Sequence, residues 1–140
     1  MWDSAMDENT VLKEQLTKEM IEAGARLTEE LDKTGVPIQA ALWFFDSEIN
    51  EWRLLFASRQ VSQTGLRPLF EGLQEALKKL GPQAEYVPSS DIRLLRIRDE
   101  PVRSLMIASP TGPGISRLRF KKSVANGHFI DDALIYRIAA

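Results

Sequence analysis

The chain has 140 residues, of which 44% are hydrophobic and 27% are charged, and it contains no cysteine. This length predicts one domain whose hydrophobic core is large enough to be stable without disulfides or bound metal ions. The lack of cysteine excludes disulfides, thiolate catalysis and cysteine-based metal sites. The net charge is only -2, but residues 1–58 carry 12 acidic and five basic residues, whereas residues 59–140 carry eight acidic and 13 basic ones.

No apolar run approaches the ~18 residues of a membrane span, and the acidic N-terminus does not resemble a secretory signal, so we expect a cytoplasmic protein. Residues 1–9 are predicted to form a flexible tail, and residues 10–140 a single domain. Apolar residues at steps of three and four predict a helix over residues 10–33, or a shorter one that begins at Lys18 and is capped by Thr17.

Gly24 lies inside this helix and predicts a close contact between helix and sheet, because glycine otherwise costs about 1 kcal/mol there. Two apolar runs around a short polar loop then predict a β-hairpin over residues 36–58. Both faces of its strands are apolar, which is typical of central strands covered on both sides. Trp43 is therefore expected in the core, and an uncovered face would instead make it part of a protein-binding patch.

A second amphipathic helix is predicted over residues 65–80, with Thr64 as its cap and Pro68 in its first turn, where the missing N–H matters least. Residues 91–98 are predicted to form a strand. Asp99 then resembles a helix cap, so residues 100–109 favour a short helix. A strand through residues 105–108 is the competing interpretation, because periodicity does not settle short apolar runs.

Asn126-Gly127 predicts a type I′ turn and with it the register of the last hairpin, which places Lys122 opposite Asp131 and Lys121 opposite Asp132. The face predicted to be core collects Leu118, Phe120, Val124, Phe129, Ala133 and Ile135. The face predicted to be basic and partly exposed collects Arg117, Arg119, Lys121, Asp132, Leu134 and Tyr136. The whole pattern predicts an α+β fold: a mostly antiparallel sheet of about five strands, made of two β-hairpins plus one strand, with two amphipathic helices and a short third helix.

The C-terminal block resembles a group of short bacterial proteins to which no activity is attached. The matching residues are Gly114-Ile115-Ser116, Arg119-Phe120, Asn126-Gly127, Phe129-Ile130, Asp132-Ala133 and Ile135-Tyr136-Arg137. The first hairpin is similar too, at Ala41-Leu42-Trp43, Trp52-Arg53 and Ala57-Ser58. The resemblance implies only a small bacterial soluble protein, and it assigns neither a cofactor nor a catalytic residue to this chain.

The sequence shows no catalytic constellation, cofactor motif or metal-ligand spacing. His128 is the only histidine, and Asp131 and Asp132 beside it are predicted to pair with lysines rather than to support acid–base catalysis. The loop over residues 111–114 has the glycines of a phosphate-binding loop, but a strand follows it rather than a helix, so an ordinary turn is favoured.

Eight basic residues and two acidic ones lie between Ile92 and Lys122. Uneven charge of this kind is typical of a solvated face, and it also suits an acidic partner or a phosphate backbone. The candidate partner-binding residues are Arg93, Arg96, Arg98, Arg117, Arg119, Lys121, Tyr136 and Trp43.

The leading hypothesis from the sequence is a non-enzymatic, protein-binding bacterial module: an accessory, immunity-type or antitoxin-type protein, or a subunit of a larger assembly. The alternative is a nucleic-acid-associated protein that uses the basic region over residues 92–122. A third, weaker hypothesis is a hydrolase with a divalent metal on carboxylates. The expected partner is another protein, with no membrane involved, and self-association would use a hairpin edge.

Overall fold

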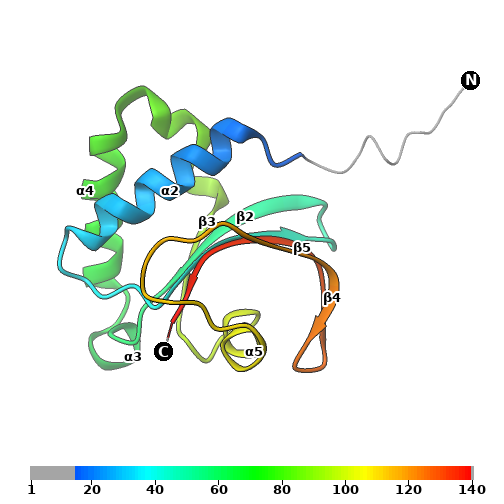
Figure 1. The fold of residues 1–140 in the computed structure, drawn as a ribbon. Helices are drawn as coiled ribbons and strands as arrows, with labels where there is room; N and C mark the ends of the chain where they lie inside the picture. Colours follow the sequence, from blue (N-terminus) through cyan, green and yellow to red (C-terminus); the bar gives the residue numbers. More distant parts are fainter. Residues whose placement is uncertain (1–14, 140) are drawn as a thin grey trace, which may run out of the picture.

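The computed structural model describes residues 15–139, which form a curved sheet with helices on both of its faces (Figure 1). Its elements, in chain order, are α2 (Lys18–Asp32), β1 (Ala40–Asp46), β2 (Glu51–Ala57), α3 (Val61–Thr64), α4 (Arg67–Leu80), η1 (Gly81–Tyr86), η2 (Ser89–Asp91), β3 (Ile92–Leu95), α5 (Val102–Ala108), β4 (Leu118–Ala125) and β5 (His128–Ile138). The predicted tail over residues 1–9, and the predicted helical residues 10–14, lie outside the described residues.

The five strands form one sheet in the order β3-β2-β1-β5-β4. The α+β class and the number of strands are as predicted, but the sheet is mixed rather than mostly antiparallel, because β3 runs parallel to β2. The connection between these two strands contains α3 and α4, and a parallel pair needs a crossover of this length to bring the chain back to the same end.

The sheet is covered on both faces, with α2 and α4 on one side and α5 inside the curve on the other (Figure 1). Alternate residues of β1 belong to different cores: Ala41, Trp43 and Phe45 pack on the side of α2 and α4, whereas Ala40 and Leu42 pack on the side of α5. The prediction of strands apolar on both faces is therefore confirmed, and β1 is the central strand.

The helix α2 begins where the shorter version of the prediction placed it. The Thr17 hydroxyl accepts a hydrogen bond from the Met20 N–H at 3.1 Å, and the Met20 sulfur accepts one from the Thr17 N–H. Gly24 marks the predicted close contact: a Cβ at this position would lie 2.5 Å from the Tyr136 hydroxyl and 2.7 Å from the Trp43 Nε1. Glycine is needed here because there is no room for a side chain.

Two predicted caps are wrong. Thr64 ends α3, where its hydroxyl donates to the Gln60 carbonyl, and the N-cap of α4 is Leu66, without a side-chain cap. Asp99 does not cap α5 either, because its carboxylate accepts from the Arg96 N–H at 2.9 Å in the preceding turn. The short helix itself is confirmed over Val102–Ala108, and the competing strand is wrong.

The register of the last hairpin is as predicted, from Ala125 opposite His128 to Leu118 opposite Ile135. Asn126 and Gly127 have φ angles of 49° and 82°, which is the positive pair that a type I′ turn requires.

The face assignment of this hairpin is only half right. Ala133 and Ile135 lie in the core on the side of α5, but towards the turn the buried residues are Ala125 and Ile130, whereas Val124 is 65% and Phe129 62% exposed. Lys122, which lies between the two parts of the strand, has a φ of 43°. A residue in the left-handed region interrupts the alternation of a strand, so the hairpin presents its other face to α5 beyond this point.

Candidate docking surface

The end of the β4–β5 hairpin carries two exposed apolar side chains, Val124 and Phe129, which we call the hairpin patch. They lie directly opposite each other across the two strands, and both are more than half exposed. Each lies next to a buried neighbour, Ala125 and Ile130 respectively. The strands therefore stay docked on the body while the patch faces solvent.

A cavity of about 390 Å³ adjoins the patch. Its lining residues come from β1, the turn that follows it, the start of α5 and the end of the hairpin: Phe44, Glu48, Glu100, Pro101, His128, Phe129 and Ile130. We call this space the hairpin cavity. Apolar walls with two carboxylates are a composition suited to recognition, since a few polar groups among apolar ones fix the orientation of what enters.

His128 connects the hairpin to the start of α5. Its Nδ1 lies 2.9 Å from the Ser104 hydroxyl, and its Nε2 lies 3.8 Å from Glu100 Oε2. Serine, histidine and glutamate in this order resemble a nucleophile with its base, but the Ser104 side chain is fully buried. Because no substrate can reach a buried hydroxyl, this constellation positions the hairpin and does not fit nucleophilic catalysis.

The two carboxylates of the hairpin cavity differ in their engagement. Glu100 Oε1 accepts a hydrogen bond from the Ser104 N–H at 3.2 Å, which ties that side chain to α5. The Glu48 N–H donates to the Asp46 carboxylate within the β1–β2 turn at 3.0 Å, but within residues 15–139 the Glu48 carboxylate itself has no hydrogen bond or ion pair. The Glu48 carboxylate is therefore available to form an ion pair with a binding partner.

The predicted basic face is largely neutralised by carboxylates. Arg117 forms a two-pronged pair with Glu22 of α2 at 2.7 and 3.0 Å. The hydrogen bond lowers the pKa of the Glu22 carboxyl and raises the pKa of the Arg117 guanidinium. This pair fastens the segment before β4 to the helix, so Arg117 is occupied within the fold.

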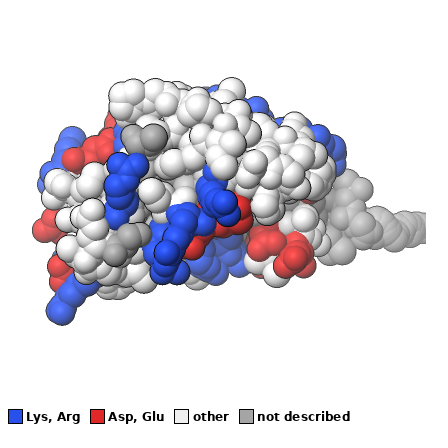
Figure 2. All heavy atoms as spheres, turned by 90° about the horizontal axis from the view of Figure 1, so that it is seen from below, with Lys and Arg blue, Asp and Glu red and all other residues white. Residues whose placement is uncertain are grey.

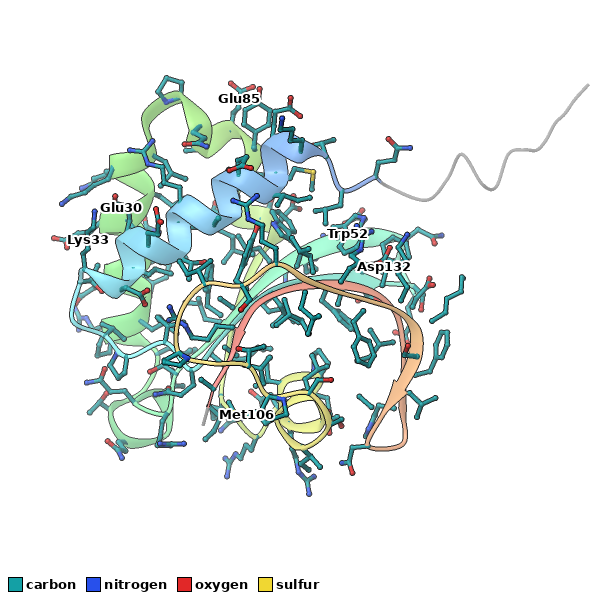
Figure 3. All side chains as sticks on the ribbon, viewed as in Figure 1. Glu30, Lys33, Trp52, Glu85, Met106 and Asp132 are labelled. Atoms are coloured by element: carbon teal, nitrogen blue, oxygen red, sulfur yellow. The ribbon has the colours of Figure 1, made fainter. Side chains whose placement is uncertain are left out.

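Arg119 is engaged in the same way. Its guanidinium donates two hydrogen bonds of 2.7 Å to the buried Asp132 and lies 5.6 Å from the centre of the Trp52 ring; Trp52 and Asp132 are labelled in Figure 3. The hydrogen bonding to Asp132 raises the pKa of Arg119. Lys121 lies opposite Asp132 in the register, as predicted. Asp132 nevertheless forms an ion pair with Arg119, because the Arg119 guanidinium binds the carboxylate through two parallel hydrogen bonds.

The other basic candidates are exposed, and two of them are engaged within the fold. Arg93 donates to the Ser90 carbonyl at 2.7 Å, and Arg96 lies 3.6 Å from the Asp99 carboxylate. In the part of the chain that the structure describes, the side chains of Arg98, Arg103 and Lys121 make no hydrogen bond or ion pair. Figure 2 shows the side that carries α5, where basic and acidic side chains are mixed and border an uncharged surface.

Trp43 and Tyr136 are fully buried, so the structure removes both from the predicted partner-binding set. The Trp43 indole N–H is within hydrogen-bond distance of the Met20 carbonyl and the Tyr136 hydroxyl, which itself donates to the Ile21 carbonyl at 2.6 Å. Burial raises the pKa of Tyr136 well above its usual value. Both side chains fasten α2 to the sheet, and the core interpretation of Trp43 is the right one.

The acid–base grouping of His128 with Asp131 and Asp132 does not form. Asp131 pairs with Lys122 at 3.3 Å, as the register predicted, and Asp132 binds Arg119. The structure brings Ser104 and Glu100 to His128 instead. Sequence reasoning missed Glu48 and Glu100 as site residues, because the turn and the start of α5 that hold them are far apart in the chain.

Two further findings concern metals and membranes. Among residues 15–139, no group of three or more histidine or acidic side chains is arranged to hold a metal ion. Within the same range, no helix combines the length and the apolar character that crossing a membrane requires.

No family model, no curated protein and no solved structure matches this chain. The resemblance of the C-terminal block to short bacterial proteins therefore stays a prediction.

Proposed function

We propose that this chain is a protein-binding module that docks its partner on the hairpin patch and the hairpin cavity. One observation carries the proposal: Val124 and Phe129 are 65% and 62% exposed, although each adjoins a buried residue of the same hairpin, Ala125 and Ile130 respectively. A large aromatic side chain in solvent next to an apolar cavity is typical of an interaction surface, whereas single scattered apolar residues are not informative.

The surface is held in place before any partner arrives, which favours binding. Ala125 and Ile130 anchor the end of the hairpin in the core on the side of α5, and the His128–Ser104 contact of 2.9 Å links it to the helix. Ordering a loop on binding costs free energy, so a preformed surface retains more of its interaction energy as affinity.

A photoreactive amino acid placed at Phe129 tests this proposal in cells of the source organism. The matched control is Phe70 on α4, which has the same chemistry and is 52% exposed. We expect the photoreactive residue at position 129 to cross-link one discrete protein. Adding Val124→Asp should abolish this cross-link, and position 70 should give no cross-linked product of the same mass. Cross-links from position 70 alone, or none from either position, would contradict the proposal.

A second candidate is binding to a phosphate backbone, which the three exposed and unpaired cations Arg98, Arg103 and Lys121 favour. Tyr136 is buried, so it is not available to stack on a nucleic-acid base. Fluorescence anisotropy with labelled single- and double-stranded DNA and RNA tests it. Binding that weakens steeply with salt, and loses about one unit of logarithmic slope per cation removed, supports this alternative. Salt-independent or absent binding eliminates it.

A further inference from the structure

We propose that the hairpin cavity receives an arginine or lysine side chain of the partner protein. This inference rests on the proposed function and adds the chemistry of the residue that anchors the complex. Its starting point is the composition of the cavity, which has two carboxylates, one imidazole and no lysine or arginine among its lining residues.

The charge of the cavity favours a cationic occupant. The Glu48 carboxylate has no hydrogen-bond or ion-pair partner among residues 15–139. One Glu100 oxygen accepts from the Ser104 N–H at 3.2 Å, and the other lies 3.8 Å from His128 Nε2. An anionic side chain would meet two like charges here. A guanidinium or ammonium group instead gains a charge-assisted hydrogen bond.

The walls of the cavity suit the rest of such a side chain. Phe44, Phe129 and Pro101 present apolar surface, on which the carbon chain of an arginine or lysine packs while its charged end reaches the carboxylates. A phenyl face also attracts a cation directly. An acidic residue in solvent attracts cations weakly, so the combination of aromatic walls and carboxylates gives the site its preference.

The volume of the cavity is large enough to admit one long side chain. About 390 Å³ is near the lower end of the roughly 300–1,000 Å³ of small-molecule sites. The exposed Val124 lies opposite Phe129 across the hairpin, so an apolar residue next to the basic one in the partner would cover the hairpin patch. The expected partner segment is therefore basic and apolar.

Two-dimensional amide NMR of the isotope-labelled chain tests this inference with capped peptides as probes. The probe is N-acetyl-arginyl-leucine amide, and its control contains citrulline, a neutral side chain of nearly the same shape. We expect shifts at Glu48, Glu100, His128 and Phe129, with the arginine peptide binding roughly two- to fivefold more tightly, as one exposed ion pair allows.

Glu48→Gln removes the carboxylate that has no partner among the described residues and should reduce the difference in affinity between the two peptides, whereas Glu85→Gln, on the exposed 3₁₀ helix η1, should preserve it. Equal binding of both peptides, shifts confined to another surface, or no shifts at about 10 mM peptide would overturn the inference, since a site weaker than that contributes little affinity. A cross-link from position 129 with no arginine preference would keep the proposed function and reject only this cationic anchor.

Discussion

Replacing Gly24 by alanine inserts a methyl group into the contact that fastens α2 to the sheet. The added Cβ would lie 2.5 Å from the Tyr136 hydroxyl and 2.7 Å from Trp43 Nε1, both closer than non-bonded atoms approach. Both groups are also hydrogen-bonded to the same helix, Trp43 to the Met20 carbonyl at 3.2 Å and Tyr136 to the Ile21 carbonyl at 2.6 Å. The helix must therefore shift, or these hydrogen bonds must break.

The size of the effect follows from opposing terms. Forcing a methyl group into a packed site costs about 1–3 kcal/mol, and weakening a buried hydrogen bond adds about 1 kcal/mol. Alanine recovers about 1 kcal/mol, because glycine is a poor helix former. We expect Gly24→Ala to lower the free energy of unfolding by about 2 kcal/mol, measured by urea denaturation followed by circular dichroism.

A double-mutant cycle with Tyr136→Phe isolates the clash. Removing the hydroxyl makes room for the new methyl group, so the double variant should be more stable than the sum of the two single changes predicts, by more than about 0.5 kcal/mol. Additive effects, or a Gly24→Ala variant as stable as the parent, would refute the steric argument.

Three other outcomes follow from the ion pairs and the hairpin patch. Arg137 is 6% exposed, and its guanidinium binds the Asp32 carboxylate at 2.8–2.9 Å. Arg137→Met should therefore lower the free energy of unfolding in urea by about 2–3 kcal/mol. An unchanged unfolding midpoint would contradict this. Arg117 lowers the pKa of Glu22 below its ordinary 4.5, so the pair stabilises above that pH and the contribution disappears as pH falls through the folded pKa. The free energy of unfolding should therefore fall less steeply at acidic pH in Arg117→Gln than in the parent chain. Identical pH profiles of the two chains would contradict the pairing. Phe129→Asp should leave the melting temperature nearly unchanged, because the side chain is 62% exposed; a large drop would mean that it is buried.

The sequence predicted those parts of the fold that local chemistry determines. The Asn126-Gly127 turn set the register of the last hairpin, and the alternation in β1 predicted a strand covered on both faces. The glycine at position 24 predicted the tight contact with the sheet. In each case the information lies within a few residues of the feature it predicts.

Other parts depended on contacts between distant segments. The direction of β3 beside β2 is not encoded in the four residues of the strand, so the mixed sheet was missed. Val124 and Phe129 fall on the apolar face of an ideal strand, and only the positive φ of Lys122 turns them to solvent. A lysine carries no recognisable signal for that conformation.

The candidate site was the least predictable part. The basic residues resembled a binding face, because no local pattern indicates that Arg117 forms a bidentate ion pair with Glu22, 95 residues away. Glu48 and Glu100 had no motif to mark them, and their common cavity depends on how the hairpin curves over α5. Clusters built from separate elements become visible only in three dimensions.

The most direct test of the docking surface compares three tagged chains purified from cells of the source organism under native conditions: the parent, Phe129→Asp and Phe70→Asp. Native mass spectrometry of each preparation reports whether a partner is bound at a defined ratio. The docking surface predicts the same complex for the parent and for Phe70→Asp and its loss from Phe129→Asp. A complex that survives Phe129→Asp but not Phe70→Asp, or the same result for all three chains, would contradict it.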